Sequence, residues 1–80
     1  MTHRTSIQAT SAFAFEIIAN GEIRSVPAGT SVAVFLAGHD LDPDLVVVEY
    51  NGEILHRAAF DRTVLEPGDA LEIVHFVGGG

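Results

Sequence analysis

The sequence contains no cysteine, no lysine and no tryptophan. Without cysteine it can form no disulfide, no thiolate metal site and no cysteine nucleophile, so any sulfur that it handles must be bonded to another atom. Its four basic residues are all arginines, against eleven acidic residues, and the formal charge is -7. Affinity for nucleic acid depends on basic groups that release the counterions of phosphates, so we expect no nucleic-acid partner.

Long apolar runs are also missing. The longest runs, such as residues 46–48, are far shorter than the roughly 20 residues that a membrane-spanning helix needs. The first dozen residues lack the apolar segment of a signal peptide. We therefore expect a soluble, cytoplasmic protein with no membrane partner.

Length and composition indicate one small domain. The chain has 80 residues, of which 48% are hydrophobic and 19% charged, so there is apolar material for one core and too little chain for two. Residues 1–12 are rich in Ser and Thr and have no period, and we expect a flexible N-terminal extension there. The domain itself is expected over residues 13–77, followed by a glycine tail at residues 78–80.

Motifs for metal binding and catalysis are not found. Four histidines are present: His3, His39, His56 and His75. None pairs with another at a ligand spacing, so we expect no metal site, and we expect His75 to be half-buried and hydrogen-bonded. Ser31, His56 and Asp61 supply the residue types of a catalytic triad, but no nucleophile elbow accompanies them. There is no GxxxxGK[ST] loop for ATP either, so we expect no catalytic residue and no bound cofactor.

The first half of the chain predicts a hairpin and a helix. Residues 13–19 alternate, so that Phe13 and every second residue after it share one face of a strand. Asn20-Gly21 accepts the positive φ angles of a type I′ turn, and residues 22–26 form the returning strand. Thr30 or Ser31 can cap a short helix that ends near Gly38 or His39.

The second half predicts a second hairpin, a loop and a last strand. Residues 45–50 are β-branched and suit a buried strand, and Asn51-Gly52 turns the chain into a short strand at residues 53–55. A loop with one helical turn is expected over residues 56–65, anchored by Phe60 and Leu65. Residues 70–77 form the last strand, on which Leu71 and Ile73 face the helix while Val74 and Phe76 face the other way.

This order of elements predicts an α+β fold, in which one helix covers a mixed sheet of four to five strands. It is the ubiquitin-like β-grasp arrangement. In that topology the first and last strands lie side by side in the middle of the sheet, so the last strand is held firmly while the residues after it are free.

The three terminal glycines are the chemically informative feature. Glycine has no Cβ, so a terminus of Gly78, Gly79 and Gly80 is thin enough to enter a narrow channel of another enzyme and present its carboxylate there. A carboxylate must be activated before it reacts, and this chain has no means of binding ATP. The tail is therefore expected to be a substrate of another protein.

Several segments combine into a recognisable pattern: Asn20-Gly21-Glu22, PAGTSV at residues 27–32, Leu41-Asp42-Pro43, VVVEYNGEIL at residues 46–55, Arg57, Val64-Leu65 and PGDALEIVHFVGGG at residues 67–80. In this combination the sequence resembles the sulfur carrier proteins of thiamine biosynthesis, the ThiS family. The resemblance covers nearly everything after Ala12.

The resemblance implies a carrier cycle. An E1-like adenylating enzyme would activate the carboxylate of Gly80 with ATP and magnesium, with Gly78 and Gly79 threaded through its active site. The adenylate would be converted to a thiocarboxylate with sulfur from a donor such as a cysteine desulfurase, and thiazole synthase would receive that sulfur. The chain would be a co-substrate and not an enzyme, and Arg57 would have a structural or docking role.

Strand parity also predicts a partner surface. Val74 and Phe76 face outward, and we expect them to lie beside Ile18 of the first strand in an exposed apolar cluster, which is typical of an interaction site. Glu16 and Glu72 around this cluster would steer the carrier towards a basic docking face.

Two other functions remain open from the sequence. A carrier for another pathway, such as the small subunit of molybdopterin synthase, would share the fold and the glycine tail. A ubiquitin-like modifier or interaction module would use the tail for an isopeptide bond or not at all. The absence of lysine excludes chains built on the protein itself.

Overall fold

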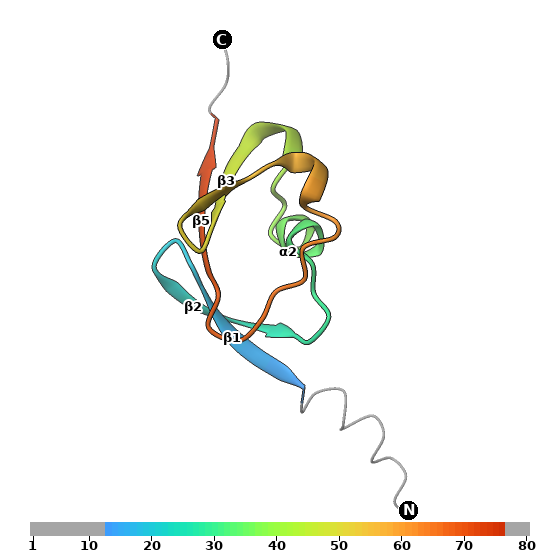
Figure 1. Cartoon of the computed structure of the whole chain (residues 1–80), viewed down its shortest axis with the longest axis vertical. Helices are drawn as coiled ribbons and strands as arrows, with labels where there is room; N and C mark the ends of the chain where they lie inside the picture. Colours follow the sequence, from blue (N-terminus) through green and yellow to red (C-terminus); the bar gives the residue numbers. More distant parts are fainter. Residues whose placement is uncertain (1–12, 77–80) are drawn as a thin grey trace, which may run out of the picture.

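The computed structural model describes residues 13–76. In this part of the chain a five-stranded sheet is covered on one face by a single α-helix (Figure 1). The elements are β1 Ala14–Ala19, β2 Glu22–Pro27, α2 Val32–Gly38, the 3-10 turn η1 Pro43–Leu45, β3 Val46–Tyr50, β4 Glu53–Leu55, the 3-10 turn η2 Arg57–Ala59 and β5 Ala70–His75. The expected extension at residues 1–12, Val77 and the tail residues Gly78, Gly79 and Gly80 lie outside the described residues.

The strands lie in the order β2-β1-β5-β3-β4. β5 runs parallel to β1 and antiparallel to β3, and both outer pairs are antiparallel hairpins. The first and last strands are therefore neighbours, and the last strand occupies the centre of the sheet. This is the β-grasp arrangement that the order of elements predicts.

Both Asn-Gly turns have the conformation predicted for them. Asn20 and Asn51 each have a φ of 51°, and Gly21 and Gly52 follow at 81° and 90°. Asparagine tolerates this left-handed region better than most residues, and glycine has no Cβ to oppose it. Two consecutive residues with positive φ match the right-handed twist of the flanking strands, so each turn closes a tight hairpin.

The helix is capped by Ser31. The Val34 N–H donates to Ser31 Oγ at 3.1 Å, while the Thr30 hydroxyl donates to the carbonyl of Pro27 at 2.7 Å. The sequence left Thr30 and Ser31 as alternatives, and the structure assigns the cap to Ser31. The helix ends at Gly38, as expected, and its buried residues are Val32, Phe35 and Leu36.

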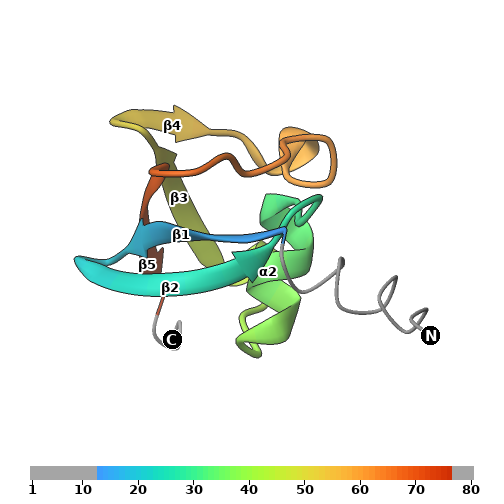
Figure 2. The same cartoon turned by 90° about the horizontal axis from the view of Figure 1, so that it is seen from below.

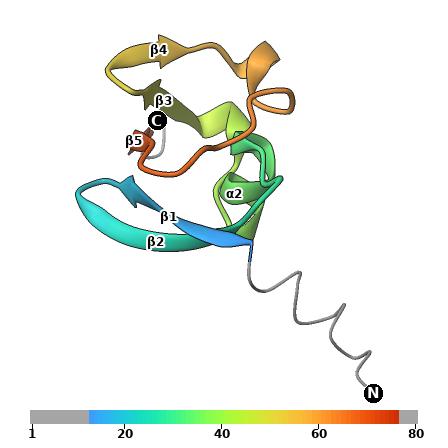
Figure 3. The same ribbon diagram turned by 60° about the horizontal axis from the view of Figure 1, so that its bottom comes forward.

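The core fills the space between the sheet and the helix. The segment between η2 and β5 passes on the same side of the sheet as α2 (Figures 1 and 3), and the Val32 N–H donates to the carbonyl of Thr63 at 2.9 Å. Phe60 and Leu65 from this segment are 3% and 2% exposed, so they anchor the loop as predicted. The fully buried side chains are Ile17, Leu36, Leu65, Leu71, Val32 and Val48.

β1 begins at Ala14, one residue after the predicted start at Phe13, and Phe13 is 63% exposed. One expectation at the end of a strand was wrong. His75 is exposed rather than half-buried. Along the inward face of β5, exposure rises from Leu71 through Ile73 to His75, so the last inward position lies past the covered part of the core.

We expect Leu36→Ala to lower the free energy of unfolding by about 2 to 5 kcal/mol, because it leaves a cavity in a fully packed site. The measurement is urea denaturation followed by circular dichroism. Val34→Ala on the same helix is the matched control, since Val34 is 60% exposed and its loss should change stability by less than about 0.5 kcal/mol. Equal effects of the two variants would contradict the packing described above.

Candidate functional site

β5 is the strand that leads to the terminal glycines, and main-chain hydrogen bonds hold it on both sides. On the β1 side, the Ile18 N–H donates to Asp69 and the Asn20 N–H donates to Leu71, each at 2.8 Å. On the β3 side, the Asn51 N–H donates to Ala70 and the Phe76 N–H donates to Leu45, also at 2.8 Å. The strand is therefore fixed from its first residue to the last described one.

Asp69 fastens the start of β5. Its carboxylate, 8% exposed, accepts hydrogen bonds from the Tyr50 hydroxyl at 2.6 Å, Asn51 Nδ2 at 3.1 Å and the Glu66 N–H at 2.8 Å. Burial by itself would raise the pKa of Asp69, but these three donors favour the ionised form and together hold the pKa below its usual range. One carboxylate thus joins the β3–β4 hairpin and the 66–69 turn to the central strand.

Tyr50 is the complementary partner in this network. The hydrogen bond to Asp69, together with burial and the nearby negative charges, raises the pKa of Tyr50 to about 12. The phenol therefore stays neutral at physiological pH and remains a donor to the carboxylate. Its role is structural, since it lies at the start of β5, away from the end that leads to the tail.

Within residues 13–76, no element covers the face of the sheet opposite the helix. Figure 2 shows α2 and the loop after η2 together on the other side of the sheet. On this outer face, within residues 13–76, large apolar side chains are exposed: Ile18 43%, Ile23 67%, Ile54 56%, Val74 59% and Phe76 50%. The face also carries Glu16, Glu49 and Glu72, all exposed.

The strand register divides this outer face into two apolar groups, one of Ile18 and Ile23 and one of Val74 and Phe76. Ile18 is opposite Ala70, four residues before Val74, so the two side chains are about 13 Å apart along the strand. Ile18 therefore shares a face with Val74 and Phe76 without being next to them, which differs from the cluster expected from parity. Between the groups, Glu72 lies directly opposite Glu49 of β3. Like charges in such a cross-strand pair repel.

A shallow apolar hollow adjoins Ile18. It has a volume of about 360 Å³ and is lined by Glu16, Ile17, Ile18, Ile23, Pro67 and Gly68. Its lining is mostly apolar, and Glu16 is its one acidic residue.

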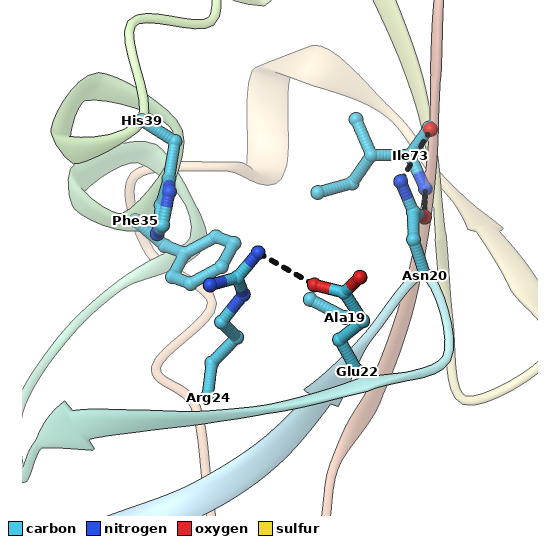
Figure 4. Close-up of a pocket in the computed structure, with 7 residues that line it drawn as sticks. All are labelled: Ala19, Asn20, Glu22, Arg24, Phe35, His39 and Ile73. Atoms are coloured by element: carbon cyan, nitrogen blue, oxygen red, sulfur yellow. Dashed lines mark hydrogen bonds and ion pairs between the residues drawn. The ribbon is translucent and has the colours of Figure 1, made fainter.

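A second hollow lies on the helix side, between the first hairpin and α2 (Figure 4). It has a volume of about 220 Å³, and its lining includes the ion pair Arg24–Glu22 at 2.8 Å and the ring of His39, whose centroid is 4.4 Å from that of Phe35. Arg24 is already paired with a carboxylate, so this hollow offers no free positive charge.

The remaining sequence candidates take structural positions. Ser31 Oγ is occupied as a helix cap, and His56 precedes η2 without a side-chain capping bond. Arg57 pairs with Asp44 at 2.8 Å, in keeping with the structural role considered for it. Among residues 13–76, no group of three or more His, Asp or Glu is arranged to hold a metal ion, and no helix there is long and apolar enough to cross a membrane.

Sequence reasoning missed the side chains that hold β5. Asn20 and Asn51 were interpreted only as turn residues, yet both also hydrogen-bond to this strand. Asp69 was interpreted as part of a tight turn, and Glu49 was not singled out. The sequence signal that could have revealed these bonds is the Asn-Gly dipeptide, which occurs in both hairpins that flank β5.

Sheet order, a single covering helix and a central C-terminal strand define a ubiquitin-like β-grasp protein. The model of the ThiS family matches residues 12–80, and the chain belongs to this family. This family includes small sulfur carrier proteins of thiamine biosynthesis.

Relatives and solved structures agree with this assignment. The chain is 44% identical over 45 residues to the sulfur carrier protein ThiS of Bacillus subtilis, a match that covers 56% of this chain and 68% of that protein. The crystal structure of the thiamine biosynthesis protein ThiS of Geobacter metallireducens is similar with a TM-score of 0.70 and 36% identity, covering 82% of this chain and all of the other.

Two longer relatives are named thiazole synthase. The protein of Magnetococcus marinus is 39% identical over 61 residues, and that of Paramagnetospirillum magneticum is 37% identical over 65 residues. These matches cover 76% and 81% of this chain, but the chain spans only 19% and 20% of the length of those relatives.

We expect Asp69→Asn to lower the free energy of unfolding at pH 7 by about 1.5 to 3 kcal/mol, because the ionised acceptor is lost. A depressed pKa means that this stabilisation is present above the ordinary pKa of an aspartate and disappears as the pH falls through and below it. Urea denaturation at pH 7, 5 and 3 should therefore give a smaller loss of stability on acidification for Asp69→Asn than for the wild type. Asp61→Asn, at an exposed position, should behave like the wild type; a wild-type pH dependence in Asp69→Asn would refute the role of Asp69.

Proposed function

We propose that this protein carries sulfur for formation of the thiazole of thiamine, as a thiocarboxylate on the C-terminal carboxylate of Gly80. An E1-like enzyme transfers AMP from ATP to that carboxylate and releases pyrophosphate. The outer sulfur of a persulfide, supplied by a donor such as a cysteine desulfurase, then displaces AMP to give an acyl disulfide. A thiol reductant supplies two electrons, cleaves the S–S bond of that disulfide and releases the thiocarboxylate. The observation that carries the proposal is a ThiS-family match that runs through the terminal glycines, directly after the central strand.

Two features of the chain support this chemistry. The absence of cysteine leaves no side-chain thiol to hold the sulfur, so the main-chain terminus is the group available for it. Glycine has no Cβ, so a tail of glycines at residues 78–80 is narrow enough to enter a partner's active site. Gly78 and Gly79 are the residues that would pass through its channel.

Thiazole synthase is proposed as the sulfur acceptor. The support is that a segment similar to this chain makes up about a fifth of two proteins with that name. A carrier joined to its acceptor in one polypeptide reaches it at a high effective concentration. A separate carrier chain must instead recognise the acceptor through its surface.

The outer face of the sheet is the proposed docking surface, with Ile18, Val74 and Phe76 as its apolar contacts. It is unobstructed by other elements of residues 13–76, and it lies on the strand that leads to the tail. Glu16, Glu49 and Glu72 give it negative charge, so a partner with basic residues around an apolar centre fits it. Docking there would bring the partner against the strand from which the tail extends.

The terminal chemistry can be tested by intact mass spectrometry of protein isolated from its native cells. We expect a fraction of the chains to carry sulfur in place of one terminal oxygen, and we expect removal of Gly79 and Gly80 to abolish this exchange without changing the circular dichroism spectrum. Sulfur loading that persists in the shortened chain would overturn the proposal. Adducts to lysines of other proteins would favour a modifier instead.

The docking surface can be tested by charge reversal. We expect Glu16→Lys with Glu72→Lys to slow association with the E1-like enzyme roughly 3- to 10-fold at low salt, because the steering charge is removed. The measurement is stopped-flow fluorescence at two ionic strengths.

Folding effects are separable in this design. In Glu72→Lys the new positive charge lies directly opposite the negative charge of Glu49. The substitution should therefore keep the free energy of unfolding unchanged or raise it by a few tenths of a kcal/mol. The control is Asp61→Lys, which makes the same change of charge at one site in the loop after η2, away from the outer face. It should leave the association rate nearly unchanged. An unchanged rate in the double variant at low salt would argue against this surface.

A further inference from the structure

Asn20 makes a two-point contact with β5 from the turn of the first hairpin. Its Oδ1 accepts the Ile73 N–H at 2.6 Å, and its Nδ2 donates to the Ile73 carbonyl at 3.1 Å (Figure 4). The last paired residue of β1 is Ala19, opposite Leu71. The side-chain amide of Asn20 therefore takes the place that the next peptide group of β1 would have occupied.

Within residues 13–76, this contact is the last one that β5 makes on the β1 side. Peptide groups of a central strand face its two neighbours alternately. Ala70 and Phe76 bond to the β3 side, whereas Leu71 bonds to Asn20 N and Ile73 bonds to the Asn20 side chain. The next peptide group that faces the β1 side is that of His75, and no strand of residues 13–76 lies beside it.

The direction of the end of β5 is thus set from two sides. The Phe76 N–H donates to Leu45 on one side, and the Asn20 amide holds Ile73 on the other. Phe76 is about 10 Å beyond Ile73, so a swing of roughly 10° about Ile73 would move it by about 2 Å. Misplacement on this scale at a reacting group can lower a rate by orders of magnitude.

We propose that Asn20 is a positioning residue for activation of the C-terminal carboxylate: its paired hydrogen bonds to Ile73 aim the end of β5, and with it the tail, at the partner's active site. The proposal rests on the proposed function and names a residue that acts through β5 rather than on the reacting atoms.

The second Asn-Gly turn supplies a matched control. Asn51 has the same φ, and its Oδ1 accepts the Ala70 N–H at 2.8 Å while its Nδ2 donates to Asp69 at 3.1 Å. It therefore makes a similar pair of bonds at the opposite end of the same strand. Glycine at either position keeps the positive φ and removes only the side chain.

The kinetic test compares Asn20→Gly with Asn51→Gly in ATP–pyrophosphate exchange catalysed by the E1-like enzyme encoded in the same genome. We expect Asn20→Gly to lower the rate at saturating carrier roughly tenfold while the half-saturating concentration changes less than about twofold, because docking is intact and the tail is misaimed. Asn51→Gly should retain the wild-type rate within about twofold despite a similar loss of stability. Asn20→Asp keeps the acceptor for the Ile73 N–H and should restore part of the rate.

Hydrogen exchange of backbone amides, measured by NMR on the carrier alone, is the second arm. Asn20→Gly should accelerate exchange at Ile73, whose N–H loses its acceptor, while Leu71 stays protected. Equal kinetic effects of the two glycine variants, a full rate in Asn20→Gly, or unchanged exchange at Ile73 would overturn the positioning role. If the wild-type chain supports no exchange of pyrophosphate at all, the proposed function fails, and the NMR arm alone then decides whether Asn20 holds the end of β5.

Discussion

The structure depends on one constraint, the double-sided pairing of β5. A C-terminal strand at a sheet edge would fray, because the last residues of a chain are ordered only when something holds them. Here the strand is inserted between β1 and β3, and its first half is also fastened by Asp69. The sheet therefore fixes the strand from which the chain continues into its terminal glycines.

The same topology determines which surface is left uncovered. One short helix and the loop after η2 can cover only one face of five strands, so the other face keeps its apolar side chains in contact with water. That face includes β5 itself. Under the proposed function, a protein docked on it would contact the strand that leads to the terminal glycines, so recognition and presentation of the carboxylate would use adjacent parts of one element.

The acidic residues of the outer face act against stability. Glu49 and Glu72 lie opposite each other, and neither forms an ion pair with a basic side chain of residues 13–76, so their repulsion destabilises the pairing of β3 with β5. Together with the formal charge of -7, the pair gives the face a negative field that a basic partner would neutralise. The arrangement is understandable if the surface is selected for recognition more than for folding.

Most of the architecture could be predicted from local signals. Asn-Gly dipeptides, the Ser31 cap and the alternation along residues 13–19 each act over a few residues, so their consequences are visible in the sequence. The bonds of Asn20 to Ile73 span 53 positions, and the opposition of Glu49 and Glu72 depends on strand register. Such contacts follow only from the assembled sheet. The exposure of His75 was missed for a similar reason. The alternation along a strand shows which face a side chain is on, but not how far the helix and loops extend over that face.

The central claim is that a rigid β-grasp domain presents the carboxylate of Gly80 as its single reacting group. The most direct measurement is NMR of protein labelled with ¹³C at the Gly80 carbonyl, in the presence of the E1-like enzyme, ATP, magnesium and a sulfur donor. The account predicts that the Gly80 carbonyl signal moves to the position of a thiocarboxylate while the backbone amide signals of residues 14–73 stay in place. An unchanged Gly80 signal under conditions where the enzyme consumes ATP with this carrier, or a modification at any side chain instead, would contradict it.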